Sequence, residues 1–126
     1  MEAKDLKEVL RYKNFKWRGR DKEGIDCFGF FLDCCKRMGM EVPDYVYNEK
    51  NAAKLLLKEY HKFFMRVDIP HIGDAILFRG NPLHIGIYVG EKRFIHFRKD
   101  MGAKVDNLYQ KPWADQVYGY FRYVGK

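Results

Sequence analysis

Residues 24–30 read Gly-Ile-Asp-Cys-Phe-Gly-Phe, and this stretch predicts where the first core helix of the chain begins. Asp26 is a residue type that caps helix N-termini, so Cys27 is expected to open the helix. The unpaired N–H groups and the positive dipole end of a helix favour a thiolate, and they can stabilise an oxyanion. Cys27 is therefore a candidate nucleophile. The alternative is a structural role, because free cysteine is often buried and Cys27 shares a helical stripe with Cys34 and Met38.

On both sides of this stretch, the spacing of apolar residues predicts helices before strands. The expected helices are residues 4–12, 27–38 and 48–64, and the expected strands are residues 75–78, 83–89, 93–97 and 117–124. Helices followed by strands, without alternation of the two, indicate an α+β fold in which N-terminal helices pack on a central antiparallel β-sheet. The chain of 126 residues shows no repeat or linker, so we expect a single domain over residues 1–126.

A hairpin over residues 83–97 is predicted to bring two histidines together. If residues 90–92 form a three-residue turn, Gly86 lies opposite His96, and His84 is a diagonal neighbour of His96 on the same face. Such neighbours have Cβ atoms about 7–8 Å apart, within reach of an imidazole–imidazole hydrogen bond. A two-residue turn would move one histidine to the other face. Taken singly, each histidine is better explained as a surface imidazole, but with the cysteine the two supply the nucleophile, base and orienting group of thiol catalysis.

Composition limits the partners of the chain. The net charge of +7 and the pI of about 9.3 favour polyanionic partners such as nucleic acid, anionic lipid or an acidic cell wall. No run of basic residues resembles a nucleic-acid-binding arm, so nucleic acid is the weaker reading of this charge. The three cysteines, two of them adjacent, predict neither a disulfide framework nor a zinc site.

The N-terminal residues are polar and charged, and no stretch approaches the ~20 apolar residues of a membrane span. We therefore expect a protein without a membrane partner that is made in the cytoplasm without a cleavable export signal. On this expectation it acts inside the cell, in a virion or after release on lysis.

Four motifs, in order, resemble those of the NlpC-type cell-wall peptidases, a family with a papain-like α+β fold. Residues 24–30 resemble the Asp-Cys-x-Gly nucleophile segment of the family. Residues 71–78 (His-Ile-Gly-Asp-Ala-Ile-Leu-Phe) resemble its Pro-Gly-Asp-Leu-Val-Phe-Phe strand. Residues 84–90 (His-Ile-Gly-Ile-Tyr-Val-Gly) resemble its His-Val-Gly-Ile-Tyr segment, and His96 stands where the family has its second histidine. The resemblance covers nearly the whole chain.

The resemblance implies cleavage of peptidoglycan stem peptides, commonly between D-glutamate and the diamino acid. It implies that Cys27 attacks the amide carbonyl, that His84 shuttles the proton, and that His96 orients His84. A thioester would form and then be hydrolysed, with no metal or organic cofactor. The residues expected to bind substrate are Phe15, Trp17, Asp26 and Phe28.

The chain departs from the family pattern at two positions. Phe15 stands where many members have a tyrosine near the active site, and Phe28 follows the nucleophile where serine is common. Phe28, together with the Pro-Asp-Tyr run at residues 43–45, resembles a subgroup found in bacteriophage and prophage tails, so phage tail proteins are expected partners. Two alternatives remain open. One is a related thiol amidase or acyltransferase, and the other is an inactive wall-binding tail module.

Overall fold

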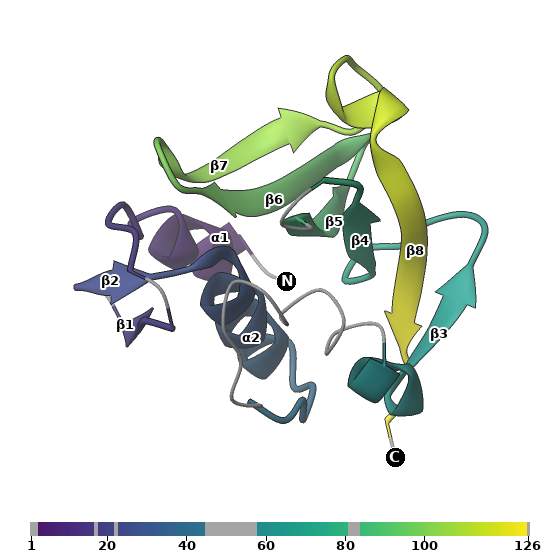
Figure 1. The fold of residues 1–126 in the computed structure, drawn as a ribbon, viewed down its shortest axis with the longest axis horizontal. Coiled ribbons are helices and arrows are strands. Elements are labelled where there is room, and N and C mark those ends of the chain that lie inside the picture. The colour runs from purple at the N-terminus through teal and green to yellow at the C-terminus, as the bar shows by residue number, and fades with distance from the viewer. Residues whose placement is uncertain (1–2, 17, 22, 45–57, 81–83, 126) are drawn as a thin grey trace.

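The computed structural model describes residues 3–16, 18–21, 23–44, 58–80 and 84–125. Figure 1 shows short helices and ribbons in the N-terminal part and a large sheet in the C-terminal part. The elements in chain order are α1 (Ala3–Val9), β1 (Arg20–Asp21), β2 (Gly24–Ile25), α2 (Cys27–Arg37), the 3-10 helix η1 (Tyr60–Lys62), β3 (Phe64–Val67), β4 (Ala75–Phe78), β5 (His84–Gly90), β6 (Arg93–Arg98), β7 (Gly102–Asn107), the 3-10 helix η2 (Trp113–Asp115) and β8 (Val117–Tyr123).

Six of the strands form one antiparallel sheet in the order β3-β8-β4-β5-β6-β7, and β1 pairs with β2 in a separate ribbon. In Figure 1, α2 lies beside this sheet, and its most extensive contacts with the sheet are to β5 and β6. The predicted α+β fold, with N-terminal helices on a central antiparallel sheet, is confirmed. Among the described residues, none of the helices has the length and apolarity that a bilayer crossing requires.

The helix predicted over residues 48–64 is wrong at its C-terminal end. The part before residue 58 lies outside the described residues, η1 covers Tyr60–Lys62, and Phe64 already begins β3. Phe64 pairs with Tyr123 of β8, and its side chain is buried. The local spacing of apolar residues favours a helix here, but pairing with a strand that is distant in the sequence stabilises a strand instead. This pairing depends on tertiary context.

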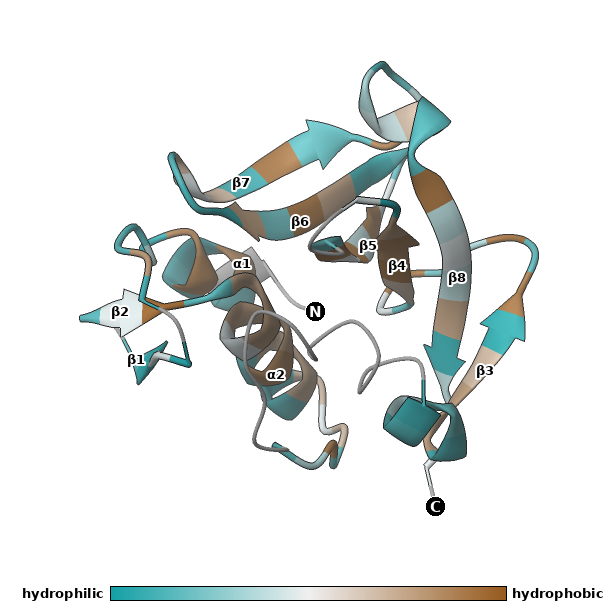
Figure 2. Ribbon diagram, viewed as in Figure 1, coloured by the Kyte–Doolittle hydropathy of each residue, from teal (hydrophilic) through white to brown (hydrophobic). Residues whose placement is uncertain are grey.

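The sheet is apolar on both faces. One core lies between α2 and the sheet and includes Phe30, Ile85 and Phe97, while a smaller cluster on the opposite face contains Phe78 and Phe94. Brown, hydrophobic colour runs along α2 and β4 in Figure 2, where these two elements contribute to the cores.

The turn between β5 and β6 differs from the prediction, but the register beyond it is the predicted one. Glu91 and Lys92 form a two-residue turn with φ angles of 53° and 65°, and Gly90 pairs with Arg93. A bulge between Tyr88 and Gly90 adds one residue to β5. Because the bulge compensates for the shorter turn, Gly86 still lies opposite His96, as predicted.

Gly86 is required by the close packing of this hairpin. A Cβ atom at position 86 would lie 2.8 Å from Cδ2 of Phe94 and 3.2 Å from the carbonyl oxygen of Ile95. The absent side chain therefore makes room for the ring of Phe94, which in turn packs against His96 with a centroid distance of 4.6 Å. Glycine at position 86 therefore allows Phe94 to pack against His96 on this face of the sheet.

Candidate active site

Cys27 is the first residue of α2, as predicted, and Asp26 is the N-cap. The Asp26 carboxylate is 1% exposed and accepts a hydrogen bond of 2.7 Å from the backbone N–H of Gly29. It also accepts one of 2.9 Å from the N–H of Arg18 and pairs with the guanidinium of Arg20 at 3.2 Å. These contacts fix the helix start against the loop that precedes it, and with it the position of the sulfur.

The approach of that loop explains the glycine two residues after the nucleophile. A Cβ atom at Gly29 would lie 2.5 Å from the carbonyl oxygen of Gly19 and 2.8 Å from Nη1 of Arg20. A neighbouring chain segment, rather than a substrate, therefore requires the glycine in the nucleophile motif.

Burial of the site favours the neutral thiol of Cys27. Burial and the charge of Asp26 raise its pKa to about 12, while the backbone N–H groups of Cys27, Phe28 and Ile85 lower it. The helix start favours the thiolate, as predicted, but desolvation has the larger effect on the pKa although Cys27 is only half-buried. A thiolate at the helix start therefore stays a prediction, which burial opposes in the free protein.

The predicted contact between the two histidines is present. Nε2 of His84 lies 2.6 Å from Nδ1 of His96, and the two ring centroids are 4.9 Å apart. Burial lowers the pKa of His84 to about 3, with smaller effects from its interaction with His96 and from the charge of Arg98. Burial also lowers the pKa of His96, so both rings are neutral at neutral pH.

The sulfur meets the sheet at the start of β5. The backbone N–H of Ile85 is near enough to the sulfur to lower the pKa of Cys27, so the sulfur lies level with the peptide that follows His84. Within the described part of the chain, no hydrogen bond joins the sulfur to the imidazole. Catalytic hydrogen bonds of free enzymes often form only once substrate is bound, so this separation is compatible with a nucleophile and its base.

Two further residues complete the histidine cluster, and sequence reasoning missed both. Oδ2 of Asp106, on β7, lies 2.7 Å from Nε2 of His96. The ring of Trp113, in η2, stacks on His84 at a centroid distance of 5.8 Å and meets His96 edge-on at 4.8 Å. The signal for Asp106 was available, because Ala103 and Val105 alternate with polar residues as in a half-buried strand.

The predicted substrate-binding residues are not gathered in one place. Asp26 caps the helix, and Phe28 is 7% exposed and packs on Tyr60 at a centroid distance of 5.4 Å. Phe15 packs against the main core, with Nζ of Lys99 5.1 Å from its ring centroid. Trp17 lies outside the described residues. A role for these four residues in substrate binding stays a prediction.

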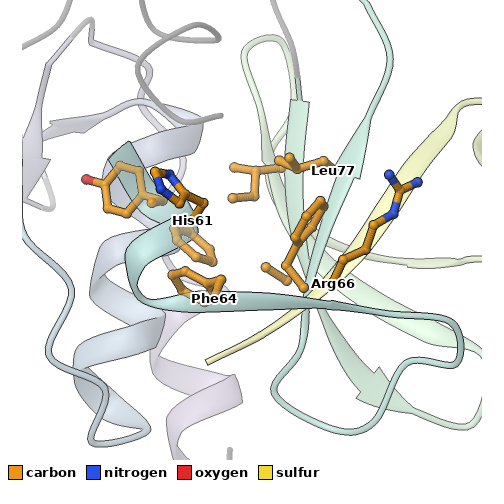
Figure 3. Close-up of a pocket in the computed structure, with 9 residues that line it drawn as sticks. His61, Phe64, Arg66 and Leu77 are labelled. Atoms are coloured by element: carbon orange, nitrogen blue, oxygen red, sulfur yellow. The ribbon is translucent and has the colours of Figure 1, made fainter. Parts of the chain in front are cut away.

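An apolar cavity of about 200 Å³ lies on the α2 side of the sheet (Figure 3). Phe64, Leu77 and Ile85 line it, together with His61 and Arg66 as its polar members. Ile85 also faces the sulfur with its backbone N–H, but Cys27, His84 and His96 do not line the cavity. Among the described residues, no group of three or more His, Cys, Asp or Glu side chains is arranged to hold a metal ion.

Fold and site together define a papain-like α+β domain that carries a cysteine at a helix start and a histidine pair on its sheet. The sequence profile of the NlpC/P60 family matches residues 12–122, so the chain belongs to the NlpC/P60 family.

Similarity to two peptidoglycan-active relatives supports this assignment. The chain is 25% identical over 118 residues to the murein DD-endopeptidase MepS/murein LD-carboxypeptidase of Escherichia coli K12, covering 90% of this chain and 58% of that protein. It is 27% identical over 113 residues to the probable peptidoglycan endopeptidase LytE of Bacillus subtilis, covering 86% of this chain and 30% of that protein. It thus spans little more than half of the first relative and less than a third of the second.

A solved structure shows the same fold. An NLP/P60-family protein similar to a lipoprotein, from Staphylococcus aureus Mu50, superposes with a TM-score of 0.69 at 19% identity, covering all of this chain and 43% of that one.

Proposed function

We propose that this chain is a thiol-dependent peptidoglycan hydrolase that cleaves an amide bond of the stem peptide. The proposal is carried by the His84–His96 pair together with Cys27 at the helix start, whose sulfur faces the N–H of Ile85, the residue that follows His84. Membership of a family whose named relatives include murein and peptidoglycan endopeptidases supports the substrate class. The net charge of +7 suits an anionic wall polymer.

The chemistry follows from the neutral resting state. The sulfur of Cys27 attacks the amide carbon while its proton passes to Nδ1 of His84, the nitrogen that the bond to His96 leaves for it. The backbone N–H groups at the start of α2 stabilise the oxyanion. The amine leaves with the proton from His84, and water then hydrolyses the thioester, which restores the thiol and releases the acid.

We further propose that the bond cleaved joins D-glutamate to the diamino acid, which rests on the resemblance of the four motifs. Mass spectrometry of muropeptides after digestion of purified sacculi tests this directly. Cleavage at the proposed bond leaves a new free amino group on the diamino acid. Opening of cross-links or release of terminal D-alanine, the two activities in the name of the E. coli relative, would instead contradict the bond assignment.

The nucleophile is tested by a pair of cysteine variants. Cys27→Ala is expected to lower the release of muropeptides by about 10³-fold or more, because the covalent step is lost. Cys34→Ala is the matched control, since Cys34 is buried in the same helix and belongs to the core. A Cys27→Ala protein that digests sacculi as fast as the control would refute the assignment.

A second candidate function is favoured by the apolar cavity beside Ile85. A thiol acyltransferase or esterase would use such a cavity for an apolar acyl group, which stem peptides lack. Incubation with a medium-chain p-nitrophenyl ester, followed by intact-protein mass spectrometry, distinguishes the two. An acyl adduct on Cys27 together with intact sacculi would favour the acyl-transfer function.

The setting in a phage or prophage tail is also a proposal. It rests on Phe28 and on the Pro-Asp-Tyr run at residues 43–45, and the names of the relatives given above mention no tail. Detection of the protein in purified virions by mass spectrometry would support it, and its absence from them would contradict it.

A further inference from the structure

We propose that Asp106 is a positioning residue that sets the tautomers of both histidines and so leaves Nδ1 of His84 free to accept the proton of Cys27. The inference rests on the proposed function, because it assigns a task within that active site. The carboxylate, His96 and His84 form one continuous chain, with 2.7 Å between Asp106 and His96 and 2.6 Å between the two imidazoles.

The direction of each hydrogen bond follows from the chemistry of the carboxylate. An ionised carboxylate only accepts, so Nε2 of His96 must carry the hydrogen that joins it to Asp106. Nδ1 of a neutral His96 is then an acceptor, and Nε2 of His84 must donate to it. The neutral ring of His84 therefore has no hydrogen on Nδ1, which is the state that a general base requires.

Asp106 can set the tautomer of His84 in this way only if His96 is neutral. A protonated His96 would donate from both nitrogens, and His84 would then accept at Nε2 and carry its own hydrogen on Nδ1. Burial and the positive charges of Arg98 and Lys104 oppose protonation of His96, and Asp106 favours it. Burial has the largest effect, since His96 is 0% exposed.

The fold holds Asp106 in this place. In the β6–β7 register Asp106 lies opposite Phe94, and His96 lies opposite Lys104, so Asp106 is a diagonal neighbour of His96. The Asp106 side chain is 30% exposed, so water solvates one side of the carboxylate while the other contacts the buried ring. Trp113 and Phe94 pack against His96, and this packing keeps water from replacing the carboxylate as its partner.

The Asp106→Asn variant tests the inference, because an amide has nearly the shape of a carboxylate but offers both a donor and an acceptor. It no longer imposes one tautomer on His96. We expect kcat on stem-peptide substrate to fall by about 10²-fold or more, with little change in KM, since the base loses its fixed tautomer. Asp68→Asn is the matched control, because Asp68 is an exposed carboxylate after β3.

Nitrogen-15 NMR of the histidine side chains supplies a readout that a structural role would not move. In the wild-type protein we expect hydrogen on Nε2 of both His84 and His96, and in Asp106→Asn we expect a mixture of tautomers. A wild-type ring with its hydrogen on Nδ1, or an Asp106→Asn protein with unchanged tautomers, would overturn the inference even if the variant folds poorly. Nε2–H tautomers in a protein that leaves sacculi intact would instead support this inference while contradicting the proposed function.

Discussion

Asp26 has two opposing effects on the residue that follows it. Its carboxylate caps α2 and binds the preceding loop through Arg18 and Arg20, which positions the sulfur of Cys27. The same negative charge raises the pKa of the thiol. The aspartate of an Asp-Cys motif therefore need not bind or protonate substrate. In this chain the aspartate stabilises the helix at the expense of the thiolate.

The Asp26→Asn variant separates these effects, because asparagine caps helices as well as aspartate does. Loss of the charge lowers the pKa of Cys27, so the fraction of thiolate at mildly alkaline pH rises. We expect iodoacetamide to alkylate Cys27 about three-fold faster or more, as measured by mass spectrometry over time. Asp21→Asn, an exposed change in β1, is expected to leave the rate unaltered. Equal rates in the two variants would contradict a charge effect of Asp26.

At the scale of elements, the β5–β6 hairpin shows what alternation in a sequence does and does not reveal. The opposition of Gly86 and His96 could be predicted, because the alternating apolar residues of both strands must face one core. The turn could not, since a two-residue turn with a bulge and a three-residue turn give the same register beyond it. The residues of the turn are compatible with both the three-residue turn and the two-residue turn with a bulge. The packing of the whole strand selects between the two.

Asp106 was missed for a related reason. Its role requires the register of a second hairpin, β6–β7, and β7 is a half-exposed strand with a weak apolar pattern. Position along the sequence did not connect it with His96, ten residues earlier. Residues that act on a catalytic ring from an adjacent strand are therefore harder to predict than those on the motif strands themselves.

The Gly86→Ala variant tests the packing of this hairpin. The added methyl group would contact the ring of Phe94, so the strand or the ring must shift. We expect the free energy of unfolding to fall by about 1–3 kcal/mol, as measured by urea denaturation. Gly119→Ala in β8 is the control, because its nearest neighbour is the flexible guanidinium of Arg66. A loss at Gly86 no larger than that at Gly119 would contradict the crowding argument.

At the scale of the whole molecule, the buried site makes stability depend on pH at both ends of the range. Burial lowers the pKa of His84 to about 3 and also lowers that of His96, so the unfolded chain binds these protons more readily. Burial raises the pKa of Cys27 to about 12, so the unfolded chain releases that proton more readily. Neither effect could be predicted from the sequence, because desolvation depends on how the whole chain covers the site.

We therefore expect the free energy of unfolding to be highest between about pH 7 and pH 8.5. The histidine contribution is complete above about pH 6.5 and is lost as pH falls toward 3, by up to about 1.4 kcal/mol per pH unit for each proton. The cysteine contribution is lost as pH rises from about 9 toward 12. Urea denaturation across this range measures both slopes. A His84→Gln variant should show a shallower acid slope, and an unchanged slope would argue against a buried neutral His84.

The indole of Trp113 contacts both imidazoles, stacked on His84 and edge-on to His96, so its fluorescence can report on the site. The chain has two tryptophans, so replacing Trp17 by phenylalanine would leave Trp113 as the single indole emitter. An imidazolium quenches an adjacent indole more strongly than an imidazole does. The emission intensity of such a protein would follow the charge of the histidine pair during turnover, without an attached dye.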